Sequence, residues 1–440
     1  MISGDDRMKR FALDKLKQWK ETNNRKPLII RGARQVGKPW LMKEFGRTCF
    51  ANVAYINFDS NTRMKQVFEG ELDIERLILA ISAESGVSID AKQTLLIFDE
   101  VQEVPRALAS LKYFYENAPQ YAIVAAGSLL GVALHEGTSF PVGKVDFMDL
   151  YPLSFQEFLC ALGEERYVTL LQSDDIDMVT MFRSKYIDRL REYYYVGGMP
   201  EAVQTYIDTK DFHLVREIQK NLLNYYQQDF SKHAAVSLVP RLNLVWNSIP
   251  MQLAKENKKY IYGQVREGAR AKDFELAIQW LLDCGLIHKV HRVSKPALPL
   301  KAYMDLDAFK IFMVDIGLLV AMTDMDAQVI IDGNRIFTEL KGALTEQYVL
   351  QQLTAELGIH PYYYSTKNST GEIDFLLQGR TSVVPLEVKA EENLRARSLK
   401  AFCDKYHPEF AVRTSMSDYR EQDWMTNIPL YYLERIKKYL

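Results

Sequence analysis

A glycine-rich segment near the N-terminus carries the residue types that bind phosphate. Residues 32–38 read GARQVGK, so that Gly32 and Gly37 frame a loop ending in Lys38. Glycines let the backbone turn until successive N–H groups point at one anion, and the lysine ammonium can then meet its outer oxygens. The apolar residues 28–30 before the loop and a helical pattern after it are the context in which this spacing holds nucleotide phosphates. The segment therefore predicts a P-loop, or Walker A motif, that binds ATP or ADP.

The residue after the lysine departs from the usual pattern. Pro39 stands where such loops carry a serine or threonine, whose hydroxyl ligates Mg²⁺. Proline has neither that hydroxyl nor a backbone N–H. The loop therefore predicts nucleotide binding and leaves open whether the nucleotide is hydrolysed; an ordinary strand-to-helix turn is the alternative. The expected nucleotide contacts are Gly32, Ala33, Arg34, Gln35, Val36, Gly37, Lys38 and Pro39.

Two carboxylates follow another apolar run, at residues 95–98. Asp99 and Glu100 end this segment, which reads LLIFDE and has the form of a Walker B strand. Behind a phosphate loop, the first carboxylate is expected to hold Mg²⁺ and the second to polarise the attacking water. Taken alone, the same letters fit two charges that merely follow a core strand. Together with the loop, they predict Asp99 as a metal ligand and Glu100 as a catalytic residue.

Residues 121–128, YAIVAAGS, form a further apolar strand with a hydroxyl at its end. Ligands of parallel sheets are met at the carboxyl ends of the strands, which makes Ser128 a candidate phosphate sensor. A helix-capping or turn role is equally compatible with this serine.

The elements that must position these residues are those of an α/β domain. Residues 5–21 place apolar side chains at helical spacing, residues 53–59 read as a strand, and residues 139–159 read as a strand followed by a helix. Alternation of apolar strands with helices is typical of a parallel sheet covered on its faces. The expected fold is an α/β P-loop sheet with flanking helices.

The C-terminal third contains a second group of charged residues. In GEIDFLL and PLEVKA, Asp374, Glu387 and Lys389 alternate with apolar neighbours, so they share the polar faces of their strands. If the strands pair, these three side chains converge, with Glu346 on a nearby helix. Paired carboxylates suit a divalent cation, and a lysine suits the water or phosphate beside it. Asp374, Glu387 and Glu346 are thus candidate metal ligands, and Lys389 is a candidate catalytic residue.

The amino-acid sequence of these strands resembles that of the PD-(D/E)xK nuclease superfamily, over residues 335–440. The resemblance implies a restriction-endonuclease-like α/β domain that acts on DNA or RNA with Mg²⁺. Exposed charges on an edge strand are the alternative, and many domains of this fold have lost catalysis. A nuclease-like fold is therefore predicted, while its activity stays open.

The middle of the chain is helical and ends in a helix that runs into an apolar strand after Gly285. This order is typical of a winged helix, a module that binds DNA or contacts proteins. The basic residues nearby do not decide between these roles. They are Arg266, Arg270, Lys272, Lys289 and Arg292.

Several segments together resemble the prokaryotic AAA-type ATPases that carry a C-terminal domain of unknown function. They are GARQVGK, LIFDEVQ, AAGS, YPLSFQEFL and GGMP, the last at residues 197–200. In that family the position of Pro39 is commonly threonine and that of Lys144 is commonly arginine. The resemblance covers nearly the whole chain and implies an ATP-binding protein, nominally an ATP hydrolase, with Mg²⁺.

Composition places the chain among ordinary globular proteins. Its 440 residues are 48% hydrophobic and carry a net charge of −2, so no global basic field points to nucleic acid. The four cysteines lack C-x-x-C spacing, and no run approaches the roughly 18 apolar residues of a membrane span. A cytoplasmic protein that does not enter the membrane is expected, and its oligomeric state is left open.

The expected organisation has three parts: an AAA-type P-loop domain at 1–205, a helical and winged-helix domain at 206–300, and a nuclease-like domain at 301–440. We expect an ATPase whose nucleotide state controls recognition of nucleic acid or of a partner protein. The alternative is a switch or scaffold that senses nucleotide without hydrolysing it, because Pro39 removes a magnesium ligand.

Overall fold

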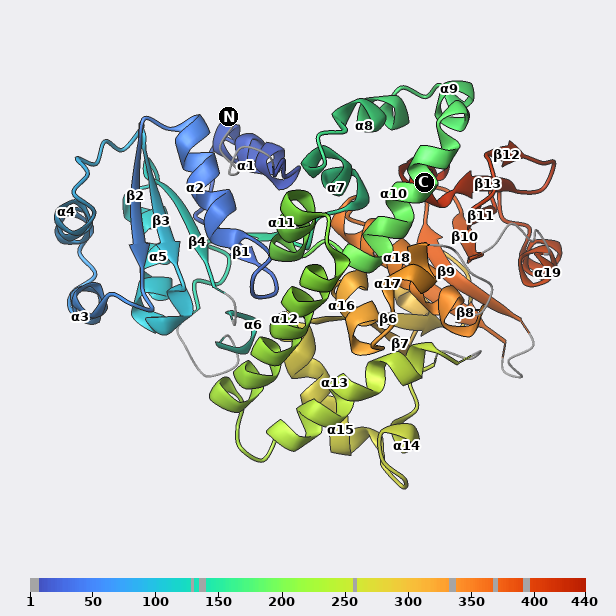
Figure 1. Ribbon diagram of the computed structural model, residues 1–440. Helices are drawn as coiled ribbons and strands as arrows, with labels where there is room; N and C mark the ends of the chain where they lie inside the picture. The colour runs from blue at the N-terminus through green and yellow to red at the C-terminus, as the bar shows by residue number, and fades with distance from the viewer. Residues whose placement is uncertain are drawn as a thin grey trace. The chain divides into compact units, whose positions relative to one another are not determined.

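The computed structural model describes residues 8–127, 130–133, 140–255, 259–331, 338–366, 371–390 and 396–440. Within these, the chain forms two compact units (Figure 1). The N-terminal unit comprises Arg10–Tyr151 with Asp283–Leu286, and the C-terminal unit comprises Pro152–Leu282 and Ile287–Leu440. No helix in the described ranges is long and apolar enough to cross a membrane.

The N-terminal unit is built on a sheet of five parallel strands in the order β2-β3-β4-β1-β5. Apolar runs explain the central strands, because β3 and β4 are buried along their whole length and cannot leave one face in water. This confirms the predicted α/β parallel sheet. The strands are β1 (Leu28–Arg31), β2 (Asn52–Asn57), β3 (Thr94–Asp99), β4 (Ala122–Ala126) and β5 (Asp146–Asp149).

Helices alternate with the strands of this sheet in the sequence (Figure 1). Phe58, Phe68 and Phe98 form an edge-to-face cluster with ring centroids 5.2–5.7 Å apart, which joins the sheet to the helices over it. The helices are α1 (Ala12–Glu21), α2 (Lys38–Cys49), α3 (Thr62–Glu69), α4 (Ile74–Ser85), η2 (Val101–Glu103), α5 (Pro105–Asn117) and α6 (Leu130–Ala133).

The first part of the C-terminal unit is helical. Helix α15 runs into β6 through Gly285, whose φ of +70° lies in the left-handed region, so the predicted helix-to-strand step is confirmed. The helices are α7 (Phe155–Ala161), α8 (Glu165–Gln172), α9 (Ile176–Met181), α10 (Arg183–Val196), α11 (Pro200–Thr209), α12 (Phe212–His233), α13 (Val239–Leu253), α14 (Tyr262–Val265) and α15 (Ala271–Asp283).

The rest of this unit surrounds an eight-stranded mixed sheet in the order β12-β13-β11-β10-β9-β8-β6-β7. Its strands are β6 (Ile287–Val293), β7 (Met304–Met313), β8 (Tyr362–Ser365), β9 (Glu372–Gln378), β10 (Val383–Val388), β11 (Val412–Ser415), β12 (Arg420–Glu421) and β13 (Thr426–Pro429). The accompanying helices are η3 (Leu300–Tyr303), α16 (Ile316–Met322), α17 (Ala327–Ile331), α18 (Thr338–Ala355), α19 (Arg397–Tyr406) and η5 (Leu430–Tyr439).

A buried polar network explains two of the sequence segments singled out above. Asp315 accepts hydrogen bonds from Gly198 N–H at 2.6 Å and from Gln351 Nε2 at 3.1 Å. Gln351 also donates to the Tyr193 hydroxyl, which in turn donates to Leu153 O at 2.5 Å. A Cβ on Gly198 would lie 2.2 Å from Leu153 O, so only glycine fits there. The YPLSF and GGMP segments therefore meet each other as parts of the scaffold.

The expected domain boundaries fall inside this one unit. Residue 205 lies within α11, and residue 300 begins η3, between the paired strands β6 and β7. The network spans both boundaries, because it joins residues 153, 198, 315 and 351. Contacts thus hold Pro152–Leu282 and Ile287–Leu440 together, and the compact division lies at residue 151.

A carboxyl pair in this unit predicts how stability depends on pH. Gln156 Nε2 donates to Glu356 at 2.8 Å and to Glu434 at 2.5 Å, which holds the two acids close together. Burial, and then the charge of Glu434, raises the pKa of Glu356 to about 8. The folded chain keeps a proton that the unfolded chain has already lost, so stability falls between about pH 4.5 and 8.

Replacing Glu356 by glutamine should remove this loss. Glu356→Gln should be more stable than the wild type at pH 8.5, by up to about 4–5 kcal/mol, and no more stable at pH 4. Urea unfolding at the two pH values measures this difference. Equal stability of the two proteins at pH 8.5 would show that folding does not raise the pKa of Glu356.

Candidate functional site

The predicted phosphate loop connects β1 to α2, and its backbone needs its glycines. Gly32 has φ of +146° and Gly37 has φ of +91°, both in the region that favours glycine. A Cβ on Gly32 would lie 2.2 Å from Leu150 O. Gln35 also adopts positive φ, at +64°. These values fit a tight loop that turns its backbone toward the start of α2.

A buried arginine braces this loop. Arg10 is 5% exposed, and its Nη1 donates to Val36 O at 2.9 Å. Its Nη2 donates to Tyr151 O at 2.6 Å, just beyond β5. Sequence reasoning missed this role, because Arg10 looks like one more polar residue at the start of an amphipathic segment.

The loop lysine lies inside the loop rather than in water. Lys38 is 3% exposed, and its Nζ donates to the carbonyls of Gly32 and Ala33, each at 2.8 Å. Burial lowers the pKa of Lys38 to about 8, although the charges of Glu100 and Asp99 oppose the shift. Those two carboxylates are therefore close enough to act on the ammonium.

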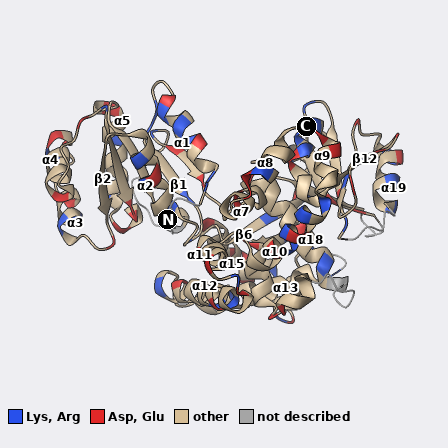
Figure 2. Cartoon of the chain, turned by 45° about the horizontal axis from the view of Figure 1, so that its top comes forward, with Lys and Arg blue, Asp and Glu red and all other residues tan. Residues whose placement is uncertain are grey.

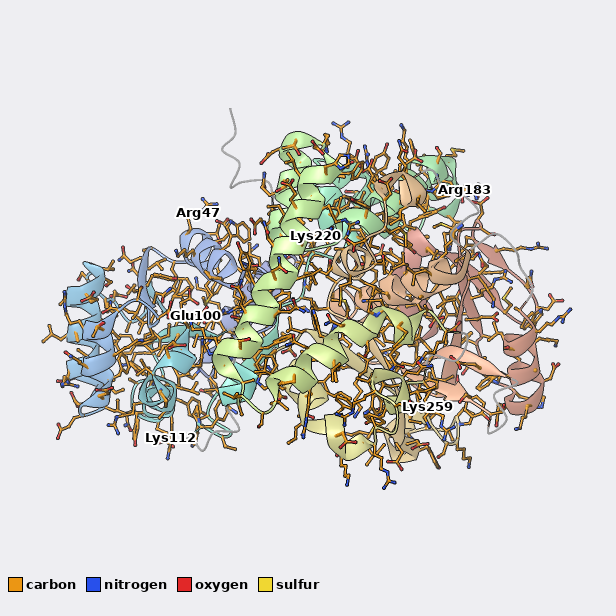
Figure 3. The ribbon with its side chains drawn as sticks, turned by 60° about the horizontal axis from the view of Figure 1, so that its bottom comes forward. Arg47, Glu100, Lys112, Arg183, Lys220 and Lys259 are labelled. Atoms are coloured by element: carbon orange, nitrogen blue, oxygen red, sulfur yellow. The ribbon has the colours of Figure 1, made fainter. Side chains whose placement is uncertain are left out.

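The acidic pair follows β3 as predicted. Asp99 is 2% exposed, and its Oδ1 accepts the backbone N–H of Glu100 at 3.0 Å. Burial raises the pKa of Asp99, and Lys38 counteracts this in part. Glu100 adopts positive φ, at +50°, and Figure 3 labels its position in this unit. The structure thus brings Lys38, Asp99 and Glu100 into one electrostatic group.

A tyrosine that the sequence did not single out touches this group. The Tyr55 hydroxyl, from β2, donates to Asp99 Oδ2 at 2.5 Å. Burial and the bond to Asp99 raise the pKa of Tyr55, so the hydroxyl keeps its proton. The Nζ of Lys43 lies 4.2 Å from the Tyr55 ring centroid and fixes the ring from α2. Because β2 is the neighbour of β3, a paired-strand reading could have placed a residue of 53–59 beside Asp99.

Gln102 is a second partner that the sequence did not indicate. Its Nε2 donates to Glu100 Oε2 at 2.6 Å and so orients that carboxylate. A Cβ on Gly127, after β4, would lie 2.1 Å from Gln102 Oε1, so the glycine makes room for this side chain. Ser128, the predicted phosphate sensor, lies outside the described residues.

Two predicted departures from the family pattern also have defined positions. Pro39 is exposed in the first turn of α2, where its fixed φ is tolerated and no hydroxyl is available. Lys144 pairs with Glu116 at 3.0 Å. Lys144 precedes β5, whereas the loop follows β1, and these strands run parallel. Lys144 therefore lies at the amino ends of the strands, whereas the P-loop of its own unit lies at their carboxyl ends, so Lys144 does not face that loop.

In the C-terminal unit, the strands that carry Asp374 and Glu387 are neighbours, as predicted. Strands β9 and β10 pair antiparallel with Phe375 opposite Leu386. The Asp374 Oδ2 atom accepts the backbone N–H of Val388 across this pair, at 2.7 Å. The predicted pairing is confirmed, and it draws these acidic residues to one region of the sheet.

The candidate metal ligands there already have cationic partners. Lys389 Nζ lies 3.1 Å from Glu387 Oε1, and the charge of Arg413 acts on the same carboxylate. Glu346 lies 3.7 Å from the buried ammonium of Lys310. Among the described residues, no three His, Cys, Asp or Glu side chains are grouped as a metal ion would require. With Lys310 and Lys389 beside them, these carboxylates do not fit a divalent cation.

The basic residues near the α15–β6 step are partly used inside the unit. Arg292 pairs with Asp305 at 2.5 Å, and Lys289 Nζ lies 4.1 Å from the Phe309 ring centroid. Burial lowers the pKa of Lys289. Figure 2 shows Lys and Arg positions interspersed with Asp and Glu positions along the helices of the chain. The described charges therefore form no strong argument for a nucleic-acid surface.

Family models match three separate parts of the chain. Residues 24–159 match the AAA domain. This segment contains the P-loop, Tyr55, Asp99 and Glu100, and it confirms the AAA part of the expected resemblance. We refer to the N-terminal unit as the AAA-like domain. Residues 187–329 match a domain of unknown function, DUF8612, and residues 341–433 match another, DUF4143. Neither match supports a nuclease.

Solved structures with P-loop ATPase folds show a distant likeness. A Walker-type ATPase of Pyrococcus abyssi is 15% identical over 72% of this chain and 97% of its own, with a TM-score of 0.46. Cdc6p from Pyrobaculum aerophilum is 12% identical over 73% of this chain and 93% of its own, with a TM-score of 0.25. Scores this low carry no argument about function. No curated protein matches the chain.

The AAA-like domain has the groups that a magnesium nucleotide needs, apart from one. Lys38 and the loop amides suit the phosphates, and the buried Asp99 carboxylate at the end of β3 suits the metal. The missing group is the hydroxyl that Pro39 replaces. The Tyr55 hydroxyl contacts the same Asp99 carboxylate from β2.

Proposed function

We propose that the AAA-like domain binds ATP with Mg²⁺ at the P-loop and hydrolyses it slowly. The observation that carries this proposal is the buried Lys38 ammonium, held by the carbonyls of Gly32 and Ala33 within the field of Asp99 and Glu100. A buried cation in a glycine loop, next to a buried carboxylate, is the charge arrangement that phosphoryl transfer uses.

Each residue has a defined part in this proposal. Loop N–H groups from Gly32 to Lys38 and the Lys38 ammonium bind the phosphates. Asp99 would hold Mg²⁺, which neutralises charge on the phosphate oxygens when bound. Glu100, oriented by Gln102, accepts the proton of the attacking water.

Tyr55 acts through Asp99 and is a positioning residue. Its hydroxyl donates to the same carboxylate that the metal needs, from a ring fixed by Lys43. A serine or threonine at the Pro39 position would supply a hydroxyl on the loop side of this carboxylate. We propose that Tyr55 supplies a hydroxyl to Asp99 from the β2 side. This hydroxyl keeps the Asp99 carboxylate ordered but does not bind the metal, so metal coordination stays one ligand short.

The pair Pro39→Thr and Tyr55→Phe tests this division of roles. Pro39→Thr should increase the ratio of ATP affinities with and without Mg²⁺ by about tenfold, because it restores a metal ligand. Tyr55→Phe should lower that ratio in the wild type and change it less in the Pro39→Thr background. Calorimetry of ATP binding in Mg²⁺ and in EDTA measures all four proteins. A ratio unaffected by either substitution would remove both assigned roles.

A nucleotide-sensing switch without turnover is the second candidate, and the exposed Pro39 at the first turn of α2 favours it. Single-turnover hydrolysis separates the two: the ATPase proposal expects product from the wild type, and faster product from Pro39→Thr. A wild type that binds ATP and yields none, beside an active Pro39→Thr, would select the switch.

We further propose that nucleotide state controls recognition of a partner by the C-terminal unit. A protein partner is favoured over DNA or RNA, because Arg292 and Lys289 are engaged within the unit and the remaining charges are mixed in sign. Capture of partners by the full chain with ATP, with ADP and with neither tests this, with added DNA and RNA as competing ligands.

A further inference from the structure

A fully buried lysine lies among the carboxylates of the C-terminal unit. Lys310, on β7, is 0% exposed, and its Nζ lies 3.7 Å from Glu346 Oε2. The same ammonium forms an ion pair with Glu372 of β9. It also lies 4.9 Å from the ring centroid of Tyr363. An isolated ammonium at this depth would be strongly unfavourable, so these partners must keep it in place.

Burial and the neighbouring carboxylates act on the pKa of Lys310 in opposite directions. Burial alone would lower the pKa of Lys310, as it does for a lysine in an apolar site. Glu346, Glu372 and Asp374 act in the opposite direction and raise the pKa above its ordinary value. The geometry points the same way, because the Lys310 ammonium lies at ion-pair distance from both Glu346 and Glu372.

Three separate elements build this cluster. Lys310 comes from β7, Glu346 from α18, and both Glu372 and Asp374 from β9. Glu346 and Asp374 are two of the residues that a D…E-x-K reading assigns to a metal ion. The third, Glu387, has its own cations in Lys389 and Arg413. Every carboxylate of the predicted metal site thus has a cationic side chain near it.

We infer that Lys310 is a built-in counter-ion that takes the place of a divalent cation, so that this cluster binds neither Mg²⁺ nor Mn²⁺ in the wild-type chain. A divalent ion among the same oxygens would meet an ammonium that cannot leave, and like charges in a buried site repel strongly. The cluster then supports no metal-dependent cleavage. This inference does not depend on nucleotide binding by the AAA-like domain.

Removing the ammonium should expose the latent site. The probe is Mn²⁺, titrated into the full chain carrying Asp99→Asn, which eliminates the other candidate metal ligand. Mn²⁺ binding to the Asp99→Asn protein should not change when Glu346→Gln is added, because the cluster holds no Mn²⁺. The melting temperature of the Asp99→Asn protein should be the same in Mn²⁺ and in EDTA. Adding Lys310→Ala should tighten Mn²⁺ binding at least about tenfold and make the melting temperature rise with Mn²⁺.

Lys400→Ala is the matched control, because Lys400 pairs with Asp404 on the exposed face of α19. It should leave Mn²⁺ binding at the level of the parent protein. The inference is overturned if the parent binds Mn²⁺ through Glu346, or if a folded Lys310→Ala protein binds no more Mn²⁺ than its parent. If Lys310→Ala does not fold, Lys310→Gln takes its place, and the parent protein's own Mn²⁺ titration decides the first point in any case.

Discussion

Lys38→Ala should weaken ATP binding at least about a hundredfold while the chain stays folded. The substitution removes the only P-loop ammonium, and charge-assisted hydrogen bonds to phosphate contribute about 1.5–3 kcal/mol each. In the structure this ammonium is held by two carbonyls, so it is already placed at the loop before any phosphate arrives. Calorimetry with ATP in Mg²⁺ measures the loss.

Lys112→Ala is the control for this prediction, since Lys112 is an exposed lysine on α5 of the same unit (Figure 3). It should bind ATP as the wild type does. Stability separates a ligand role from a structural one. Because the pKa of Lys38 is about 8 when folded and near 10.5 when unfolded, the wild type should gain stability relative to Lys38→Met as the pH rises between these values. If the Lys38→Ala protein is unfolded at 25 °C, Lys38 is needed for folding, and its role is structural.

Glu100→Gln should abolish most turnover and preserve nucleotide binding. The amide keeps the shape and the contact with Gln102 but cannot accept a proton, and general-base catalysis is worth about 10²–10⁴-fold. Single-turnover hydrolysis with excess enzyme measures the rate, and calorimetry confirms that ATP still binds.

Glu103→Gln is its matched control, because Glu103 is an exposed carboxylate three residues further along the chain. Its turnover should equal that of the wild type. Equal rates for Glu100→Gln and wild type would place the proton acceptor elsewhere and withdraw the catalytic role of Glu100.

The sequence predicted the site residues that lie close together along the chain, but not those that reach the site from other elements of the fold. Gly32, Lys38, Asp99 and Glu100 lie at fixed distances within two short segments, so their spacing alone indicates phosphate chemistry. Arg10 and Tyr55 reach the site through tertiary contacts, to Val36 and Asp99 respectively. Neither residue type nor local spacing marks such a contact before the strand order is known.

The C-terminal unit shows the same limit more sharply. Alternation predicted correctly that Asp374 and Glu387 lie on paired strands. It gave no sign of Lys310, which comes from a strand some sixty residues earlier and changes the charge of the cluster. The boundaries at 205 and 300 were placed by local breaks, whereas the Asp315 network joins both sides of each break.

Hydrogen exchange at the P-loop tests the central claim most directly, because it reads the amides that are proposed to hold phosphate. Addition of ATP and Mg²⁺ to the wild-type chain should slow exchange of the amides from Gly32 to Lys38 by at least about tenfold. The Lys38→Ala protein should show no such protection at the same ATP concentration. Exchange of these amides that is unchanged by saturating ATP in the wild type would contradict nucleotide binding at this loop. Exchange slowed equally in Lys38→Ala would contradict the role assigned to Lys38.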